Sequence, residues 1–125
     1  MDRRIRYVSK QVQPADKTVT ETIPLFQVKA NERVLACTVR VLTGNTTGTQ
    51  TAEVGDGSDT DRFVTTANIT INSAGIYDGS GAGFASTGGY LYTTADTVDL
   101  LYTADGNSTV SAVFRVTAVI ETWPG

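Results

Sequence analysis

The sequence has no histidine and only one cysteine among its 125 residues. Without histidine, Ser-His-Asp and Cys-His catalysis, zinc sites with histidine ligands and a histidine pH switch are all excluded. The single cysteine, Cys37, cannot form a disulfide within the chain. It lies on the apolar side of an alternating segment, so we expect a small buried hydrophobic residue and not a reactive thiol.

Long apolar segments are also missing. No window approaches the roughly 20 apolar residues that a membrane-spanning helix needs, so no membrane partner is expected. The N-terminal stretch MDRRIRYVSKQ carries charges but no apolar segment, so no secretory signal is expected. No segment keeps a helical period over three turns, and a chain of this length suits one domain with one core.

The charges are unevenly placed along the chain. The formal net charge is −3, but residues 1–40 carry eight Arg or Lys and four Asp or Glu, whereas residues 41–125 carry two and nine. Such opposed halves favour association with a charged partner or a neighbouring copy. There is no basic helix and almost no interleaving of aromatic and basic residues, so nucleic acid is not an expected partner.

The basic residues near the N-terminus form one cluster. Its members are Arg3, Arg4, Arg6 and Lys10. We expect residues 1–17 to form an extended arm that is either solvated or placed on an acidic neighbour, since Arg binds carboxylates bidentately. Ile5 and Tyr7 are expected to face the interior, and residues 18–125 to form the folded domain.

Two long runs of alternating residues predict the main strands. In Arg33–Thr43, one side of an extended chain would be apolar, with Val34 and Leu42 as exceptions on the other side. Asn107–Glu121 alternates over a greater length. The apolar positions are Leu35, Cys37, Val39 and Val41 in the first run, and Val110, Ala112, Phe114, Val116, Ala118 and Ile120 in the second. Abundant Thr and Val, with frequent turn signals, predict an all-β fold with antiparallel sheets.

Turn signals predict how successive strands would pair. The short turn Ala30–Glu32 favours a hairpin between Thr22–Lys29 and Arg33–Thr43, and Asp105-Gly106 favours another before the last strand. Pro24 favours an edge position or a bulge within its strand. The many glycines of Ser73–Gly89 predict an irregular, packed loop.

Three aspartates share one short loop. Asp56, Asp59 and Asp61 could offer oxygen ligands to Ca²⁺, but an EF-hand counted from Asp56 would have Ser58 at its third position and Ala67 at its twelfth. The sequence therefore favours a solvated turn in which Asp side chains accept hydrogen bonds from backbone N–H groups. These aspartates are only weak metal candidates, and no cofactor is expected.

The aromatic residues offer one alternative function. Tyr77, Tyr90 and Tyr92 could stack on sugar rings, although such residues more often fill the margin of a core or a subunit contact. Asp96 and Asp99 lie on opposite faces of one strand, so they do not form the carboxylate pair of a glycosidase. We expect no enzymatic activity, and a hydrolase using aspartates is the least favoured class.

The order of the segments resembles a known family. IPLFQVKANERVLACTVRVLT is followed by TAEVGDGSDTDRFVT, a glycine-rich loop, and DTVDLLYTADGNSTVSAVFRVTAVIE. The middle segment carries a loop pattern formed by Val54, Gly55, Asp56, Asp59, Asp61 and Phe63. Over about residues 22–121 this succession resembles the small head decoration (cement) proteins of tailed bacteriophages.

The resemblance implies a jelly-roll-like β-sandwich that forms a homotrimer on the outer capsid surface of the virion. The expected function is to decorate and stabilise the capsid by bridging subunits of the major capsid protein, after synthesis in the host cytoplasm. The basic N-terminal residues would then contact the capsid or a neighbouring protomer, which is an inference from their charge. The alternative is a carbohydrate-binding module of a phage tail or spike.

Overall fold

The computed structural model describes residues 4–15, 19–44, 49–66, 69, 71, 73–78, 89–105 and 112–122. Within these ranges the chain forms eight strands. They are β1 (Arg4–Val12), β2 (Glu21–Val28), β3 (Glu32–Thr43), β4 (Thr51–Gly55), β5 (Gly75–Asp78), β6 (Tyr90–Leu91), β7 (Asp96–Thr103) and β8 (Val113–Thr122). No helix in this part of the chain is long and apolar enough to span a membrane.

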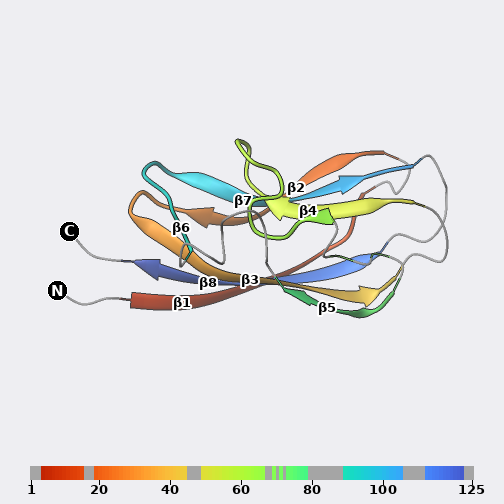
Figure 1. Ribbon diagram of the computed structural model, residues 1–125, viewed down its shortest axis with the longest axis horizontal. Coiled ribbons are helices and arrows are strands. Elements are labelled where there is room, and N and C mark those ends of the chain that lie inside the picture. Colours follow the sequence, from red (N-terminus) through yellow and green to blue (C-terminus); the bar gives the residue numbers. More distant parts are fainter. Residues whose placement is uncertain are drawn as a thin grey trace.

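The strands form two antiparallel sheets that lie face to face (Figure 1). The five-stranded sheet has the order β1-β8-β3-β5, and β6 also pairs with β3. The three-stranded sheet has the order β2-β7-β4 and forms the upper layer in Figure 1. The predicted all-β antiparallel sandwich is therefore confirmed.

The strands pair in a nested order, as they would in one long hairpin folded over into two sheets. Strand β1 pairs with β8, β2 with β7 and β3 with β6, so strands from the two halves of the chain meet in nested pairs. A bridge between Val54 of β4 and Val64 stands at the innermost position of this nest. Nested pairing across two sheets is the arrangement of a jelly roll, which confirms the fold implied by the resemblance.

The two predicted hairpins are wrong. Strands β2 and β3 lie in different sheets, as do β7 and β8, so each short connection takes the chain from one layer to the other. At the first connection Asn31 has a φ of 70°, and its N–H donates to the carbonyl of Tyr92 over 2.7 Å. A turn signal indicates where the chain reverses, but it does not say which strand becomes the partner.

The core lies between the sheets and follows the predicted alternation. Phe114, Val116 and Ile120 of β8 have no exposed surface. In β3 the register shifts between Val34 and Ala36, so the buried face changes parity at this bulge. The bulge explains why Val34, an exception to the simple alternation, is completely buried.

Strand β2 confirms the prediction from Pro24. It is the edge strand of its sheet, and its register with β7 shifts between Pro24 and Phe26. The prediction for Ser73–Gly89 is wrong at Gly75–Asp78, which form β5 against β3. Residues 79–88 of that segment lie outside the described residues.

Strand β1 contradicts one prediction. Ile5 and Tyr7 were expected to face inward, but 42% and 76% of their surfaces are exposed. Their partners on β8 are Glu121 and Val119, whereas the intervening Arg6 is opposite the buried Ile120. The inner face of β1 therefore carries basic residues, because only the even-numbered positions point towards the second sheet. The boundary of the arm at residue 17 stays a prediction, although Arg4–Val12 pair with β8 throughout.

Candidate functional site

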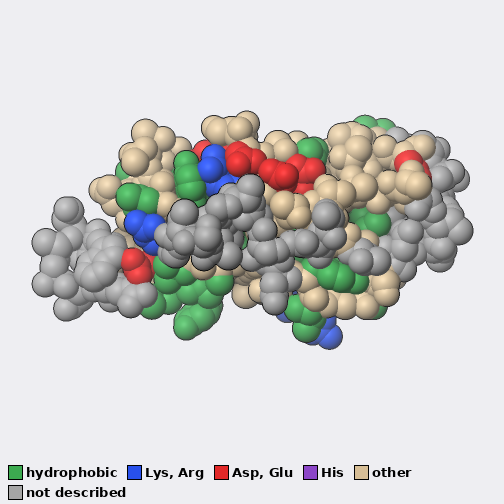
Figure 2. All heavy atoms as spheres, in the orientation of Figure 1, with side chains coloured by type: hydrophobic (Ala, Val, Ile, Leu, Met, Phe, Trp, Pro, Cys, Tyr) green, Lys and Arg blue, Asp and Glu red, His purple; other side chains and the backbone are tan. Residues whose placement is uncertain are grey.

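The outer face of the five-stranded sheet gathers exposed hydrophobic residues. Residues directly opposite each other in an antiparallel pair share a face, so Ile5 and Tyr7 lie on the same face as Leu91, which is opposite Arg33. Ile76, opposite Arg40, lies on it too. Of the five exposed large hydrophobic side chains among the described residues, only Val19 lies elsewhere. Figure 2 shows hydrophobic side chains projecting from this lower side of the molecule.

Most of these residues cluster at one end of the face. Tyr7, Val119 and Ala36 stand in one row across β1, β8 and β3. Ile5 and Leu91 belong to the next row, on either side of Glu121 and Arg33. We call Ile5, Tyr7, Ala36, Leu91 and Val119 the apolar patch. Contiguous exposed apolar side chains on a folded protein mark a surface that other molecules cover.

The other end of the same face carries two arginines. Arg40 of β3 is directly opposite Arg115 of β8, and Ile76 of β5 is opposite Arg40 on the other side. They line a depression of about 320 Å³. We call its lining, Thr38, Arg40, Ile76, Arg115 and Thr117, the arginine depression. Val119, the patch residue on β8, is four positions along the strand from Arg115, a distance of roughly 13 Å.

Three of the four basic residues singled out in the sequence are described, and two bind within the chain. Arg6 donates to the carbonyl of Gln27 and to Glu32 Oε1, each over 3.0 Å. Lys10 donates to the carbonyl of Pro24 over 3.0 Å. Both acceptors on β2 belong to an edge strand, so these cations close the open side of the sandwich. Arg3 lies outside the described residues, and Arg4 is exposed at the start of β1. Their contact with a capsid or protomer stays a prediction.

Glu32 holds Arg6 in place. Its side chain is buried, and burial alone would raise the pKa of its carboxyl. Hydrogen bonds from the Thr122 hydroxyl, the Lys29 N–H and Arg6 outweigh burial and lower that pKa. The carboxylate therefore stays charged, and it ties the ends of β1 and β8 to the turn after β2. Beside it lies a hollow of about 390 Å³, lined by Arg4, Ile5, Arg6, Lys29, Glu32 and Thr122.

The aspartate loop is built around a buried carboxylate. Asp56 Oδ1 accepts hydrogen bonds from the N–H groups of Ser58 and Asp59 over 3.0 and 2.9 Å. Asp56 Oδ2 accepts from Arg62 Nε and from the Tyr92 hydroxyl, both over 2.8 Å. The expected capping of backbone N–H groups is confirmed, but the expected solvation is wrong for Asp56, which is 2% exposed. Through these hydrogen bonds, the Asp56 side chain holds the loop that follows β4 in one conformation.

Two aspartates of this loop have pKa values shifted in opposite directions. Burial would raise the pKa of Asp56, but the hydrogen bonds from Arg62 and Tyr92 lower it below its usual value. The pKa of Asp61 is raised by its hydrogen bond with Asp59, by burial and by the charge of Glu53. Among the described residues no group of three His, Cys, Asp or Glu side chains is arranged to hold a metal ion. Metal binding by the three aspartates stays untested, and both oxygens of Asp56 already have two donors.

The structure brings together two of the three tyrosines proposed for glycan contact. The rings of Tyr90 and Tyr92 are 4.9 Å apart, and the guanidinium of Arg62 lies 3.8 Å from the centre of the Tyr90 ring. Tyr92 is 4% exposed, so its ring offers almost no surface for a sugar. Tyr77 is separate on β5, opposite Val39 on the inner face. Glycan contact by these residues stays a prediction.

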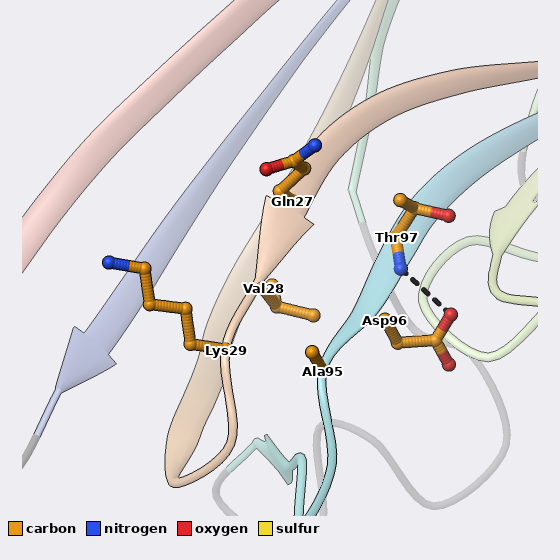
Figure 3. Close-up of a pocket in the computed structure, with 6 residues that line it drawn as sticks. All are labelled: Gln27, Val28, Lys29, Ala95, Asp96 and Thr97. Atoms are coloured by element: carbon orange, nitrogen blue, oxygen red, sulfur yellow. Dashed lines mark hydrogen bonds between the residues drawn. The ribbon is translucent and has the colours of Figure 1, made fainter.

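Another hollow lies at the end of β2 and β7. It has a volume of about 410 Å³ and is drawn in Figure 3. Its two charged side chains, Lys29 and Asp96, point in opposite directions, and Asp96 accepts from the N–H of Thr97 over 2.7 Å. This geometry does not form an acid–base pair. Cys37 is buried at 3% exposure as expected, and burial raises the pKa of its thiol to about 12.

Comparisons with known proteins identify the fold. No family model and no curated protein match the sequence. A chain from the capsid asymmetric unit of cyanophage Pam1 matches with a TM-score of 0.70 and 14% identity, over 98% of this chain and 86% of that chain. This chain therefore shares the fold of that capsid chain. A chain from the acidic stable capsid of Helicobacter pylori bacteriophage KHP30 matches with a TM-score of 0.55 and 17% identity, over 98% and 100%.

These matches confirm the expected resemblance at the level of the fold. The sequence did not predict the apolar patch or the arginine depression on the outer face of the five-stranded sheet. Arg40 and Arg115 both occupy polar positions of alternating strands, and that was the available signal. Their direct opposition depends on the register between β3 and β8, which neither strand specifies alone.

Proposed function

We propose that this chain is a structural protein of a phage virion that decorates the capsid and stabilises it by bridging major capsid subunits. The fold shared with chains from two phage capsids supports the virion role. The observation that carries the proposal further is that, among the described residues, four of the five exposed large hydrophobic side chains lie on one sheet face. A rigid sheet face that presents apolar residues is suited to adhesion.

In this proposal the apolar patch contacts the outer capsid surface. Tyr7 is its most exposed member, and tyrosines are frequent energetic centres of protein interfaces. A protein that binds only the assembled shell stabilises it by mass action, by RT ln(1 + [L]/Kd). In a homotrimer, three such patches would bind together, and avidity would strengthen weak single contacts. Arg4 is exposed at the first position of β1 and is next to Ile5 in the chain, so we propose it as the basic residue beside this contact.

The test uses purified heads that lack this protein, to which the chain is added back. The double variant Ile5→Ser/Tyr7→Ser should bind these heads at least about tenfold more weakly than the unaltered chain. Both side chains are exposed, so the variant should keep its circular dichroism spectrum and thermal midpoint. Binding is measured by sedimentation of the heads with labelled chain.

The matched control is Val19→Ser, which removes an exposed hydrophobic side chain outside this face. Its affinity for heads should be unchanged. Failure of the unaltered chain to bind heads would refute the proposed function. Equal losses in Val19→Ser and in the double variant would refute the role of the apolar patch. Deleting residues 1–12 is a poorer test, because it also removes β1 and exposes the edge of β8.

A further inference from the structure

Among the side chains that the structure describes, no carboxylate pairs with the positive charge of the arginine depression. Arg40 and Arg115 stand directly opposite each other, and like charges in that position destabilise a sheet. Arg115 donates to the neutral amide oxygen of Gln11 over 2.9 Å. Among the described side chains, which do not include that of Asp78, Arg40 has no hydrogen-bond acceptor and neither arginine has a carboxylate partner. Guanidinium groups bind carboxylates bidentately, so this pair beside the exposed Ile76 is suited to a carboxylate carried on another surface.

A second surface of the same chain has the opposite imbalance. Glu53, Asp59 and Asp61 form what we call the acidic row, at the end of β4 and in the loop that follows. Figure 2 shows acidic side chains in a row along this upper part of the molecule. The pKa of Asp61 is raised by its hydrogen bond with Asp59 and by burial, and also by the negative charges of Asp59 and Glu53. In the described part of the chain, none of the three has an ion-pair partner, since Arg62 is bound to Asp56.

We infer that the arginine depression of one copy receives the acidic row of a second copy. The contact would neutralise a crowded pair of cations and a crowded set of anions at the same time. The hydroxyl of Thr38 lies beside the arginines and can donate to a remaining carboxylate oxygen. Charge complementarity between two surfaces of one chain points to a second copy and not to an unrelated acidic protein.

The contact joins two different patches, so it is heterologous. A two-fold contact of the depression with itself would place four arginines together, and this is disfavoured. Heterologous contacts close into rings or continue as filaments. The homotrimer of the proposed function is such a ring, and in that respect the inference rests on it. The apolar patch lies at the other end of the sheet face and stays available for the shell.

The first test measures self-association without heads, by sedimentation velocity over a range of concentrations. The double variant Arg40→Gln/Arg115→Gln should raise the dissociation constant at least about tenfold. The matched control is Arg33→Gln, which removes the same charge from the same strand and face, opposite Glu121. It should leave association unchanged. The association of the unaltered chain should also weaken as the salt concentration rises.

The second test exchanges the charges. Arg40→Glu/Arg115→Glu and Asp59→Lys/Asp61→Lys should each fail to associate alone, because both patches of each variant then have the same sign. Mixed in equal amounts, the two variants should associate with each other, which is detected by labelling one of them. Restored association would assign the contact to these two patches, and circular dichroism would establish that both variants are folded.

Three outcomes overturn the inference. The unaltered chain could stay monomeric at all concentrations, the arginine variant could associate as well as the control, or the exchanged variants could fail to recognise each other. The result is independent of head binding. Weak association with retained head occupancy would refute only this contact, whereas intact association without head occupancy would refute only the proposed function.

Discussion

The clearest prediction concerns the buried carboxylate of Asp56. Asp56→Asn keeps the shape of the side chain and one oxygen, which can still accept from the N–H groups of Ser58 and Asp59. The new amide places an N–H₂ or an uncharged oxygen against Arg62 Nε. Arg62, whose side chain is 17% exposed, would then lose its only ion-pair partner in the described structure.

The expected cost follows from this geometry. Breaking a buried ion pair by removing one partner costs about 3–5 kcal/mol. We expect about 3 kcal/mol here, at the lower end, because Arg62 keeps some contact with water and its place over the Tyr90 ring. For a domain of this size that corresponds to a decrease of about 12 °C in the midpoint of thermal unfolding. Thermal and urea unfolding followed by circular dichroism measure both quantities.

The pH dependence gives the prediction its sign. The pKa of Asp56 in the folded protein is lowered, so its charge contributes stability above the unfolded pKa of about 3.9. This stability is lost as the pH falls through the folded pKa. Asp56→Asn should therefore lose most stability at pH 7 and approach the unaltered chain in acid.

Asp99→Asn is the matched control. Burial raises the pKa of Asp99, so its charge disfavours the folded state as the pH rises through its pKa values. Its removal at pH 7 should leave stability unchanged or increase it. A loss below about 1 kcal/mol in Asp56→Asn, or an equal loss in both variants, would refute the structural role that we give to the Asp56 carboxylate.

Three further predictions test the loop and the core. A Cβ at Gly55 would lie 2.1 Å from the carbonyl oxygen of Asp59, whereas one at Gly57 would meet nothing within 4 Å, so Gly55→Ala should cost about 1–3 kcal/mol in urea unfolding and Gly57→Ala much less. Phe114→Ala should cost about 3–5 kcal/mol in the same assay because Phe114 is completely buried, and a cost near that of a surface change would contradict its place in the core. Cys37 should react with a thiol reagent only at the rate of unfolding, since its thiol is buried and has a pKa of about 12; rapid labelling of the folded chain would show that it is accessible.

The sequence predicted strands well because alternation depends only on the face that each strand buries. Val39 and Val116 follow this rule in β3 and β8, and Pro24 marked an edge and a bulge. The pairing of the strands was not predicted correctly. Glu32 begins β3 only four residues after β2 ends, yet the two strands belong to opposite sheets. Local turn chemistry favours a reversal, whereas the choice of partner is made by burial across the whole sandwich.

The candidate site was less predictable for the same reason. The role of Asp56 as an acceptor of backbone N–H groups is local and could be predicted from its turn. Its bond with the Tyr92 hydroxyl joins residues 36 positions apart, and no local pattern indicates it. The arginine depression likewise requires the register of three strands. A surface that depends on the register between strands cannot be predicted from the pattern of any single strand.

The edges of the sandwich explain why its contacts should involve faces. Arg6 and Lys10 point inward from the edge strand β1, and they bind carbonyl groups of the edge strand β2. Inward-pointing charges on an edge strand prevent another strand from pairing there, because pairing would require their desolvation. A copy or a shell subunit that approached this edge would have to displace both cations. The outer sheet face, with its apolar patch and its pair of arginines, has no such barrier, so assembly through that face is favoured over extension of the sheets at the edge formed by β1 and β2.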